Sequence, residues 1–345
     1  MIPRRQVTLA EIAQRAGVHV STVSRSLADV PTGVGSEKAA RIRAIAEEMG
    51  YRRDLAATML RTGKSGALGM IVPRITDYVL SRIVEGVDDA ARRLGYTTVV
   101  VSSNDDPQLR LERIEQLLER RVDGLIIGDA RLDGDEVLPM LKRRDINYAL
   151  VNRRLSGYLS ATADDAQGGR LAAEHLLSLG HTEIGVIAGL NYATTCVDRT
   201  YGFVHYYKSH GVTVRDDMVL TSRADTQGGY EAARELLARN PQLTALFTIN
   251  DFAAIGAMGA VRESGRTTGV DVAIVGYNDI PLAQYLPVPL TSVHSPMFEM
   301  GQEGARLLTR LIDGSSVETL NLAPSLVVRE SSMLSATTPT TRIPE

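Results

Sequence analysis

The chain has 345 residues, a formal net charge of −3 and a single cysteine, Cys196. This length exceeds a comfortable single hydrophobic core, so two or three folding units are expected. One cysteine excludes an internal disulfide and suits a reducing cytoplasm. The sequence has no long apolar run, so we expect neither a signal peptide nor a membrane span.

The charge is distributed unevenly along the chain. Residues 1–64 carry 11 Lys and Arg against 6 Asp and Glu, whereas the remainder carries 27 against 35. An excess of five positive charges in a small N-terminal segment is typical of a nucleic-acid-binding end.

Residues 8–27 predict two short helices around a turn at Gly17. In the first helix, Leu9, Ile12, Ala13 and Ala16 recur at i, i+3, i+4 and i+7 and form one apolar face. A second helix is expected from about Val20 to Leu27. Its Val20, Val23 and Leu27 form a stripe that faces the same apolar partner as the first helix. Ser21 and Arg25 then share an outward face with Thr22, and an arginine there suits guanine recognition in the major groove. The alternative is an ordinary helical hairpin in a larger helical domain.

The pattern Ala-Gly-Val-x-x-x-Thr-Val-Ser-Arg at 16–25 makes this segment closely similar to the DNA-binding motif of the LacI/GalR repressor family. The resemblance places Val20, Ser21 and Arg25 at base-reading positions. His19 stands where the family usually has a serine that caps the helix. Two roles are therefore considered for His19: capping the helix or contacting a DNA phosphate. The DNA-binding residues expected from the resemblance are Thr8, His19, Val20, Ser21, Thr22, Ser24, Arg25 and Leu60.

A third helix is expected from a cap at Ser36 to about Met49, closing a small helical core. The segment from Asp54 to Leu60 is too short to be a stable helix alone in water. It resembles the family's hinge helix, in which a leucine matching Leu60 wedges into the minor groove. The alternative is a plain linker, and Arg53 and Thr58 depart from the family pattern.

From residue 67 the pattern alternates between strands and helices, which is typical of doubly wound parallel sheets. Strands are expected at 67–72, 97–102, 123–128, 147–151, 184–188, 245–249 and 272–276. Helices are expected at 80–94, 108–120, 167–179, 228–238 and 253–264. Two stretches 60 residues apart, Asp165-Ala-Gln-Gly-Gly and Asp225-Thr-Gln-Gly-Gly, echo each other as helix starts.

Ligands of such sheets bind beyond the carboxyl ends of the strands, where polar residues gather in this sequence. Among these polar residues are Asp105, Asn152, Asn250 and Asn278. Such side chains are also common helix caps and turn formers. The motifs Gly180-His-Thr-Glu-Ile-Gly and Val275-Gly-Tyr-Asn-Asp resemble the family's effector domain, which is similar to periplasmic sugar-binding proteins.

By this resemblance, Arg153, Arg199 and Asp251 are the foremost ligand contacts, since arginine binds bidentately and aspartate accepts from hydroxyls. Asp77-Tyr-Val-Leu80 replaces the usual Asn-Pro-Phe-Phe, and Asn278 and His294 also depart from the family. A pentose, another sugar or a nucleoside would suit a polar cleft. The expected ligand-binding residues are Arg74, Asp77, Tyr78, Asn104, Arg153, Arg199, Asp251 and Asp279.

We therefore expect an all-α helix-turn-helix head followed by an α/β effector domain of two doubly wound subdomains. The expected boundaries are 1–53 for the head, 54–65 for the hinge, 66–163 with 295–321 for one subdomain, 164–294 with 322–331 for the other, and 332–345 for a disordered tail. No catalytic residues, metal site or cofactor are predicted.

The expected function is a ligand-responsive repressor that binds near-palindromic DNA as a homodimer in the cytoplasm, without a membrane partner. The alternative is a solute-binding protein for sugar uptake. A third hypothesis, an enzyme of sugar metabolism, predicts turnover of a sugar.

Overall fold

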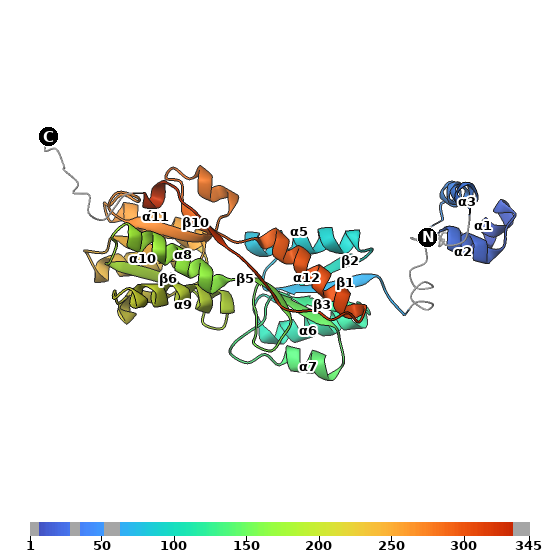
Figure 1. Ribbon diagram of the computed structural model, residues 1–345, viewed down its shortest axis with the longest axis horizontal. Coiled ribbons are helices and arrows are strands. Elements are labelled where there is room, and N and C mark those ends of the chain that lie inside the picture. The colour runs from blue at the N-terminus through green and yellow to red at the C-terminus, as the bar shows by residue number, and fades with distance from the viewer. Residues whose placement is uncertain (1–6, 28–34, 52–62, 334–345) are drawn as a thin grey trace, which may run out of the picture. The chain divides into compact units, whose positions relative to one another are not determined.

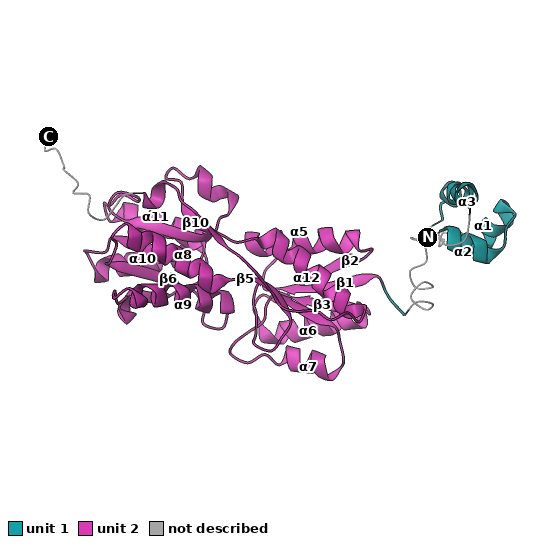
Figure 2. Cartoon of the chain, in the orientation of Figure 1, with its two compact units in different colours: residues 1–65 teal, residues 66–345 magenta. Residues whose placement is uncertain are grey.

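The computed structural model describes residues 7–27, 35–51 and 63–333, and the chain divides into two compact units (Figure 2). The first unit is Met1–Ser65 and the second is Gly66–Glu345. Thr58 and Leu60 of the expected hinge lie outside the described residues, as do Arg53 just before it and the tail from residue 334.

The first unit contains a core of three helices, α1 (Leu9–Ala16), α2 (Val20–Ser26) and α3 (Ser36–Glu48). Each helix contributes one side chain of at most 1% exposure to this core: Ile12, Val23 and Ile42. Gly17 ends α1 with φ of 65°, in the left-handed region that glycine adopts without strain. The expected helix-turn-helix is therefore present.

Two details of the first unit differ from the expectation. Val20 is 40% exposed, so it does not belong to the buried stripe, and Val23 alone of that stripe is fully buried. Val20 is the first residue of α2. Ser36 is also the first residue of its helix rather than the cap, which is Gly35 and makes no side-chain hydrogen bond.

The second unit is built on two six-stranded sheets (Figure 1). The first has the order β11 (Leu320–Leu322), β5 (Ser160–Ala163), β4 (Tyr148–Val151), β3 (Gly124–Ile127), β1 (Ala67–Val72) and β2 (Thr97–Ser102). The second has the order β12 (Ser325–Val327), β10 (Thr291–His294), β9 (Ala273–Asn278), β8 (Ala245–Thr248), β6 (Ile184–Ala188) and β7 (Val219–Thr221).

All strand pairs in both sheets are parallel except β10 with β12, which is antiparallel at an edge. The two expected doubly wound sheets are therefore confirmed, with one antiparallel edge strand added. The seven expected strands are all present. Short strands β5, β7, β10, β11 and β12 were not expected, because three or four residues carry too little periodicity to recognise.

Helices cover both faces of each sheet and enclose four buried cores. On the first sheet, α5 (Tyr78–Arg93) and α12 (Met297–Ile312) cover one face, and α6 (Pro107–Glu119) and α7 (Val137–Arg143) cover the other. On the second sheet, α8 (Asp165–Ser178) and α9 (Thr194–Ser209) cover one face, and α10 (Thr226–Arg239) and α11 (Asp251–Glu263) cover the other.

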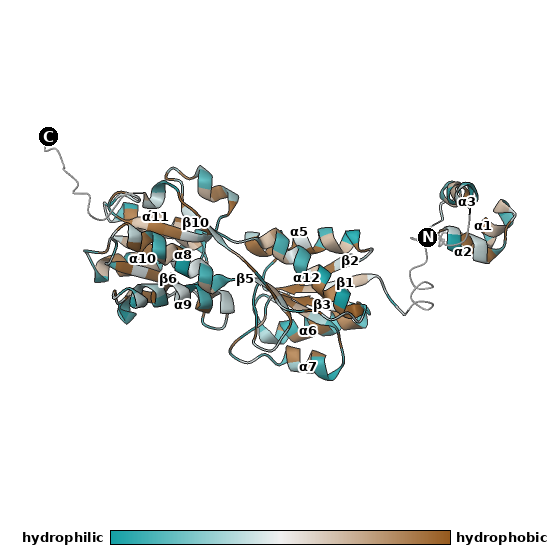
Figure 3. Ribbon diagram, in the orientation of Figure 1, coloured by the Kyte–Doolittle hydropathy of each residue, from teal (hydrophilic) through white to brown (hydrophobic). Residues whose placement is uncertain are grey.

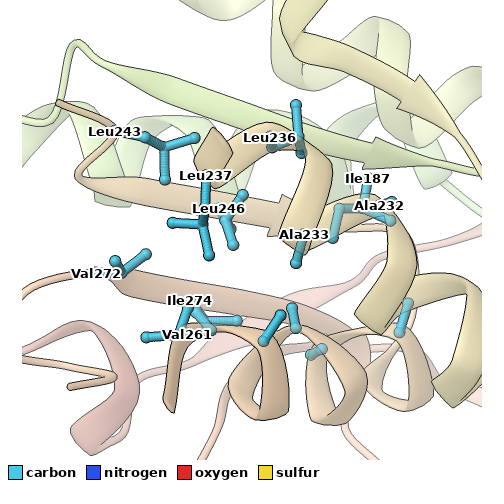
Figure 4. Close-up of a cluster of buried hydrophobic side chains, with 14 of the residues drawn as sticks. Ile187, Ala232, Ala233, Leu236, Leu237, Leu243, Leu246, Val261, Val272 and Ile274 are labelled. Carbon is cyan, nitrogen blue, oxygen red and sulfur yellow. The ribbon is translucent and has the colours of Figure 1, made fainter. Parts of the chain in front are cut away.

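The buried cores follow from the hydropathy of the elements. Strands are predominantly apolar, whereas the helices have one apolar and one polar side (Figure 3). Figure 4 shows one such core, in which Leu236 of α10 and Val261 of α11 lie close to Leu246 of β8 and Ile274 of β9. Strands buried on both faces require such continuous apolar runs.

Glycines allow three helix pairs to approach closely: α5 with α12, α8 with α9, and α10 with α11. Each helix of a pair contributes one of them, namely Gly86, Gly301, Gly169, Gly202, Gly229 and Gly256. A Cβ at any of the six would lie 2.0–2.2 Å from a carbonyl oxygen of the partner helix. The echoed Gly-Gly motifs therefore supply Gly169 and Gly229, one contact glycine for each of two pairs.

The chain passes between the two sheets three times. It leaves the first sheet after β5, returns after β10 to form α12, and crosses again between β11 and β12. Residues 67–163 and 297–322 thus supply the first half of the second unit. Residues 165–294 and 325–327 supply the strands and helices of the second half.

Candidate functional site

The exposed side of α2 carries the residues expected to read DNA. Ser21 and Arg25 are both exposed, and the Nε of Arg25 donates to the carbonyl of Ser21 at 3.2 Å. This contact leaves the two terminal nitrogens of the guanidinium without an intramolecular partner among the described residues. Those nitrogens are the ones that a guanine-directed arginine uses.

His19 caps α2 itself. Its Nδ1 accepts the Ser21 backbone N–H at 3.3 Å and lies 2.8 Å from the Ser21 hydroxyl. An imidazole acceptor therefore does what a serine hydroxyl does at an ordinary cap. A phosphate contact by the other ring nitrogen stays a prediction.

Thr8 caps α1 through a reciprocal pair with Glu11. The Thr8 hydroxyl accepts the Glu11 N–H at 3.3 Å, and the Glu11 carboxylate accepts the Thr8 N–H at 2.8 Å. Thr22 and Ser24 are half-buried on α2. Of the eight expected DNA-binding residues, seven are therefore described, and their contacts to DNA stay predictions; Leu60 lies outside the described residues.

A polar cleft lies in the second unit and is lined from both sheets. Its lining comes from the ends of strands and starts of helices and includes Arg74, Asp77, Asp105, Asn152, Arg153, Tyr192, Arg199, Asp225, Asn250 and Asn278. Its empty volume of about 930 Å³ includes the open mouth.

Two arginines are held rigidly in the cleft wall by carboxylates. The terminal nitrogens of Arg153 lie 2.9 and 3.2 Å from the two oxygens of Asp105. The Nε of Arg199 lies 2.7 Å from Asp165, and another of its nitrogens donates to the Ile249 carbonyl at 2.8 Å. Arg153 and Arg199 are only 8% and 7% exposed, so their orientations are fixed before a ligand arrives.

Strained backbone gathers at the same strand ends. Five non-glycine residues after β2, β4 and at the end of β9 have φ between 52° and 100°, namely Asn104, Asp105, Asn152, Asn278 and Asp279. Such conformations cluster at binding sites, where surrounding contacts must hold them. Asn278 is 3% exposed, and its amide oxygen has no hydrogen-bond partner among the described residues.

The eight expected ligand residues divide equally. Arg74, Asp77, Arg153 and Arg199 line the cleft, whereas Tyr78, Asn104, Asp251 and Asp279 do not. Tyr78 packs against apolar cores of both halves, and Asn104 is an acceptor for the Ser102 hydroxyl at 3.2 Å.

Asp251 has its own partners below the cleft. It is fully buried and accepts the Ser292 hydroxyl at 2.6 Å and the Ile280 N–H at 2.8 Å. Burial raises the pKa of this carboxyl from 3.8 to about 7, against the lowering effect of the two hydrogen bonds. Asp279 lies 2.8 Å from Arg329 and 3.3 Å from His294. Neither carboxylate is among the residues that line the cleft.

In the sequence pairs Asn250-Asp251 and Asn278-Asp279, the asparagine lines the cleft and the aspartate does not. Asn250 caps α11 and Asn278 ends β9, and each lies one position before the expected aspartate. Asp105 and Asn152 were also noted at strand ends but not chosen as ligand contacts. Tyr192 had no sequence signal, because it lies in a loop with no periodicity.

Tyr192 also joins the two halves beside the cleft. Its carbonyl accepts the Leu132 N–H at 2.9 Å, and the Arg131 guanidinium lies 3.9 Å from its ring centre. Burial and the nearby Asp105 carboxylate raise the pKa of Tyr192. A second bridge joins Arg154 to Asp198 at 2.8 Å. These contacts tie loops of the first half to the start of α9 in the second half.

The lining of the cleft also includes the single cysteine of the chain, Cys196. Burial raises the pKa of this thiol and so disfavours the reactive thiolate. Among the described residues, no group of three or more His, Cys, Asp or Glu is placed to hold a metal ion. Within the same residues, no helix has both the length and the apolarity needed to cross a membrane.

Two family models match the chain and together cover most of it. Residues 8–54 match the bacterial regulatory proteins of the lacI family. Residues 65–325 match the periplasmic binding proteins and sugar binding domain of the LacI family.

Relatives and solved structures agree with these matches. The transcriptional regulator DegA of Bacillus subtilis (strain 168) is 31% identical over 94% of this chain and 98% of its own length. The regulator GalR of Escherichia coli (strain K12) is 28% identical over 94% and 95%. A lac repressor dimer bound to operator and the anti-inducer ONPF is 26% identical, with a TM-score of 0.85 over 95% of this chain and 99% of that one. A CelR–cellobiose complex is 28% identical, with a TM-score of 0.73 over 95% and 100%.

Proposed function

Because the chain belongs to the LacI family of bacterial regulatory proteins and is a DNA-binding transcriptional regulator, we propose that it represses transcription as a homodimer on a near-palindromic operator. A small sugar- or nucleoside-like effector bound in the cleft modulates this binding. The protein acts in the cytoplasm, where its DNA target lies.

The operator half of the proposal is supported by the exposed face of α2. Ser21 and Arg25 are exposed there, and Val20 lies beside Ser21 with 40% exposure. An arginine and short side chains on a helix of a basic three-helix unit suit direct reading of base edges in the major groove. Two copies would read two half-sites.

The cleft supports the part of the proposal that concerns the effector. It joins polar side chains from the ends of both sheets, including two arginines held by carboxylates. Fixed, planar hydrogen-bonding groups recognise ring hydroxyls with little loss of entropy on binding. The relatives whose printed descriptions name ligands include complexes with cellobiose and with ribose.

A ligand bound between the two halves couples effector binding to operator binding. Three strand connections join the halves, so a ligand that contacts both would move one against the other. We propose that the two halves, residues 66–163 with 295–322 and residues 164–294 with 323–331, are the moving subdomains, the boundary after β11 lying one residue later than the sequence suggested. We also propose that residues 54–65 carry the movement to the head. The coupling must be reciprocal, because effector and operator act on one conformational equilibrium.

The test is selection of genomic fragments by the purified full-length chain at near-physiological salt, with and without a panel of sugars and nucleosides. We expect enrichment of a near-palindrome whose occupancy changes with one compound. Binding without sequence preference would contradict the repressor function.

Two controls separate the alternatives. A solute-binding protein would bind a sugar tightly with no sequence-selective DNA binding, so each compound is also titrated against protein without DNA. An enzyme would convert the compound, so the titrated samples are analysed for product. Substantial turnover would contradict the proposal.

A further inference from the structure

We propose that the effector carries an anionic group, a carboxylate or a phosphate on a sugar-sized molecule, and that Arg74 binds this group; the inference rests on the proposed function. The relatives with cellobiose and ribose show that neutral sugars occupy this fold elsewhere. The distribution of charge partners in the cleft of this chain points to a different ligand class.

Three of the four arginines in the cleft lining already have carboxylate partners. The pairs are Arg153 with Asp105 at 2.9 Å, Arg199 with Asp165 at 2.7 Å, and Arg223 with Asp225 at 3.5 Å. Arg74 follows β1 and is exposed, and its guanidinium makes no hydrogen bond or ion pair with the described residues. It is therefore the cleft arginine for which a ligand could supply the counter-charge.

The carboxylates of the lining are engaged elsewhere. Asp77 caps α5 by accepting the N–H groups of Val79 and Leu80 at 2.8 and 3.4 Å. Asp225 caps α10 by accepting the Gly228 N–H at 2.7 Å. The remaining lining carboxylate is Asp105, held by Arg153. Arg74 is thus not neutralised by a described neighbour, and the cleft favours a negative group there.

The wall on the other side of the cleft offers uncharged groups for the rest of such a ligand. The side chain of Asn278 is buried and its amide oxygen has no hydrogen-bond partner among the described residues, on a backbone with φ of 100°. A strained, buried and unpartnered amide that lines a cavity indicates a ligand contact. The Asn278 amide suits a hydrogen bond with a ligand hydroxyl beside the anionic group.

The start of α9 adds a favourable field from the second half. This helix begins at Thr194, its cap Ala193 makes no side-chain hydrogen bond, and Ala193, Thr195 and Cys196 line the cleft. The first N–H groups of a helix have no partner within it and carry partial positive charge. An anion in the cleft is therefore attracted both by Arg74 of the first half and by α9 of the second, which favours closure.

The test compares neutral and anionic partners of the same sugar on the full-length protein at constant ionic strength. The probes are D-glucose with D-gluconate and glucose 6-phosphate, D-galactose with D-galacturonate, D-ribose with ribose 5-phosphate, and inorganic phosphate alone. Binding is read as the shift in Tm and by calorimetric titration. The variants are Arg74→Gln and, as a control of the same charge change, Arg113→Gln, a half-buried residue of α6 that does not line the cleft.

We expect an anionic probe to raise Tm while its neutral partner does not, with affinity at least about tenfold weaker in Arg74→Gln and unchanged in Arg113→Gln. If the carboxylate probe and the phosphate probe bind with different affinities, the tighter one identifies which anionic group the effector carries. The inference is overturned if a neutral sugar binds as tightly as its anionic partner, if Arg74→Gln has no effect, or if no anionic probe binds at millimolar concentration. Operator selection is measured in parallel, and only its loss would contradict the proposed function.

Discussion

At the residue scale, small differences in position decide which side chains can meet a ligand. Asn250 and Asp251 are neighbours, yet one lines the cleft and the other is fully buried on Ser292 and the Ile280 N–H. The sequence motif alone could not separate them, because the direction of a side chain at a helix start depends on where the preceding strand ends. Arg153 and Arg199 were predicted through the resemblance to the family, and the structure holds both in the cleft wall against Asp105 and Asp165.

Arg25→Ala should weaken specific operator binding by about 1–3 kcal/mol and relax the choice at one base pair of each half-site. The exposed guanidinium is then lost from the reading face without disturbing the core at Val23. Binding to operator variants and to random DNA is measured by titration. Arg41→Ala on α3 removes the same charge and should weaken binding to operator and to random DNA alike. If Arg25→Ala and Arg41→Ala had equal effects on the two kinds of DNA, the role of Arg25 would be contradicted.

Asp251 should make stability depend on pH. Its folded pKa of about 7 exceeds the ordinary value of 3.8, so the folded state holds a proton that the unfolded state has already lost. This contribution is complete at low pH and disappears as the pH rises through about 7. The free energy of unfolding should therefore fall by about 1.4 kcal/mol for each pH unit between about pH 4 and 7.

Asp251→Asn keeps the shape but removes the titration, so this part of the pH dependence should vanish. Urea denaturation across that pH range measures it, with the exposed Asp216→Asn as the control that should retain the slope. Equal slopes for the parent and Asp251→Asn would show that the carboxyl titrates normally.

At the element scale, three helix pairs are held together by glycines whose role depends on the partner helix. The echoed Gly-Gly motifs were visible in the sequence, but their contacts with α9 and α11 were not. Gly86 and Gly301 have no such motif and lie more than 200 positions apart, so only the tertiary structure shows that they face the same interface.

Gly301→Ala should destabilise the second unit by about 3 kcal/mol or more, because its Cβ would lie 2.1 Å from the Ile83 carbonyl oxygen and the two helices must separate. The measurement is the free energy of unfolding in urea. Gly259→Ala on α11 is the matched control, because its Cβ would meet only the Tyr230 side chain of α10, at 3.7 Å. Alanine should there stabilise by up to about 1 kcal/mol, and destabilisation of both variants alike would contradict the packing argument.

At the scale of the second unit, strand connections and a few side-chain bridges join two independently cored halves. Each half has apolar cores on both faces of its sheet, whereas beside the cleft the halves meet through Tyr192 and the Arg154–Asp198 pair. Cores of this kind resist deformation, while a few polar bridges can exchange partners. The bridges are therefore the place where a ligand can shift the equilibrium.

Tyr192→Ala should loosen this contact without unfolding either half. The Leu132 N–H, which donates to the Tyr192 carbonyl, should exchange with solvent faster once Arg131 loses the aromatic ring. Hydrogen exchange of the full chain measures this, and amides within β1 serve as the internal reference because that strand is buried. An unchanged rate at Leu132 would show that the ring does not hold the halves together.

The sequence by itself determined the kind of molecule: a helix-turn-helix head, two doubly wound sheets, and a repressor of the LacI/GalR type. The helices and sheets follow from hydrophobic periodicity, which is a local property of the sequence. The repressor function follows from the resemblance of short motifs to that family. Tertiary structure decided the strand order, the antiparallel β12, the glycine contacts between helices, and which polar residues face the cleft. Those features join residues far apart in the chain, so the packing of whole elements fixes them.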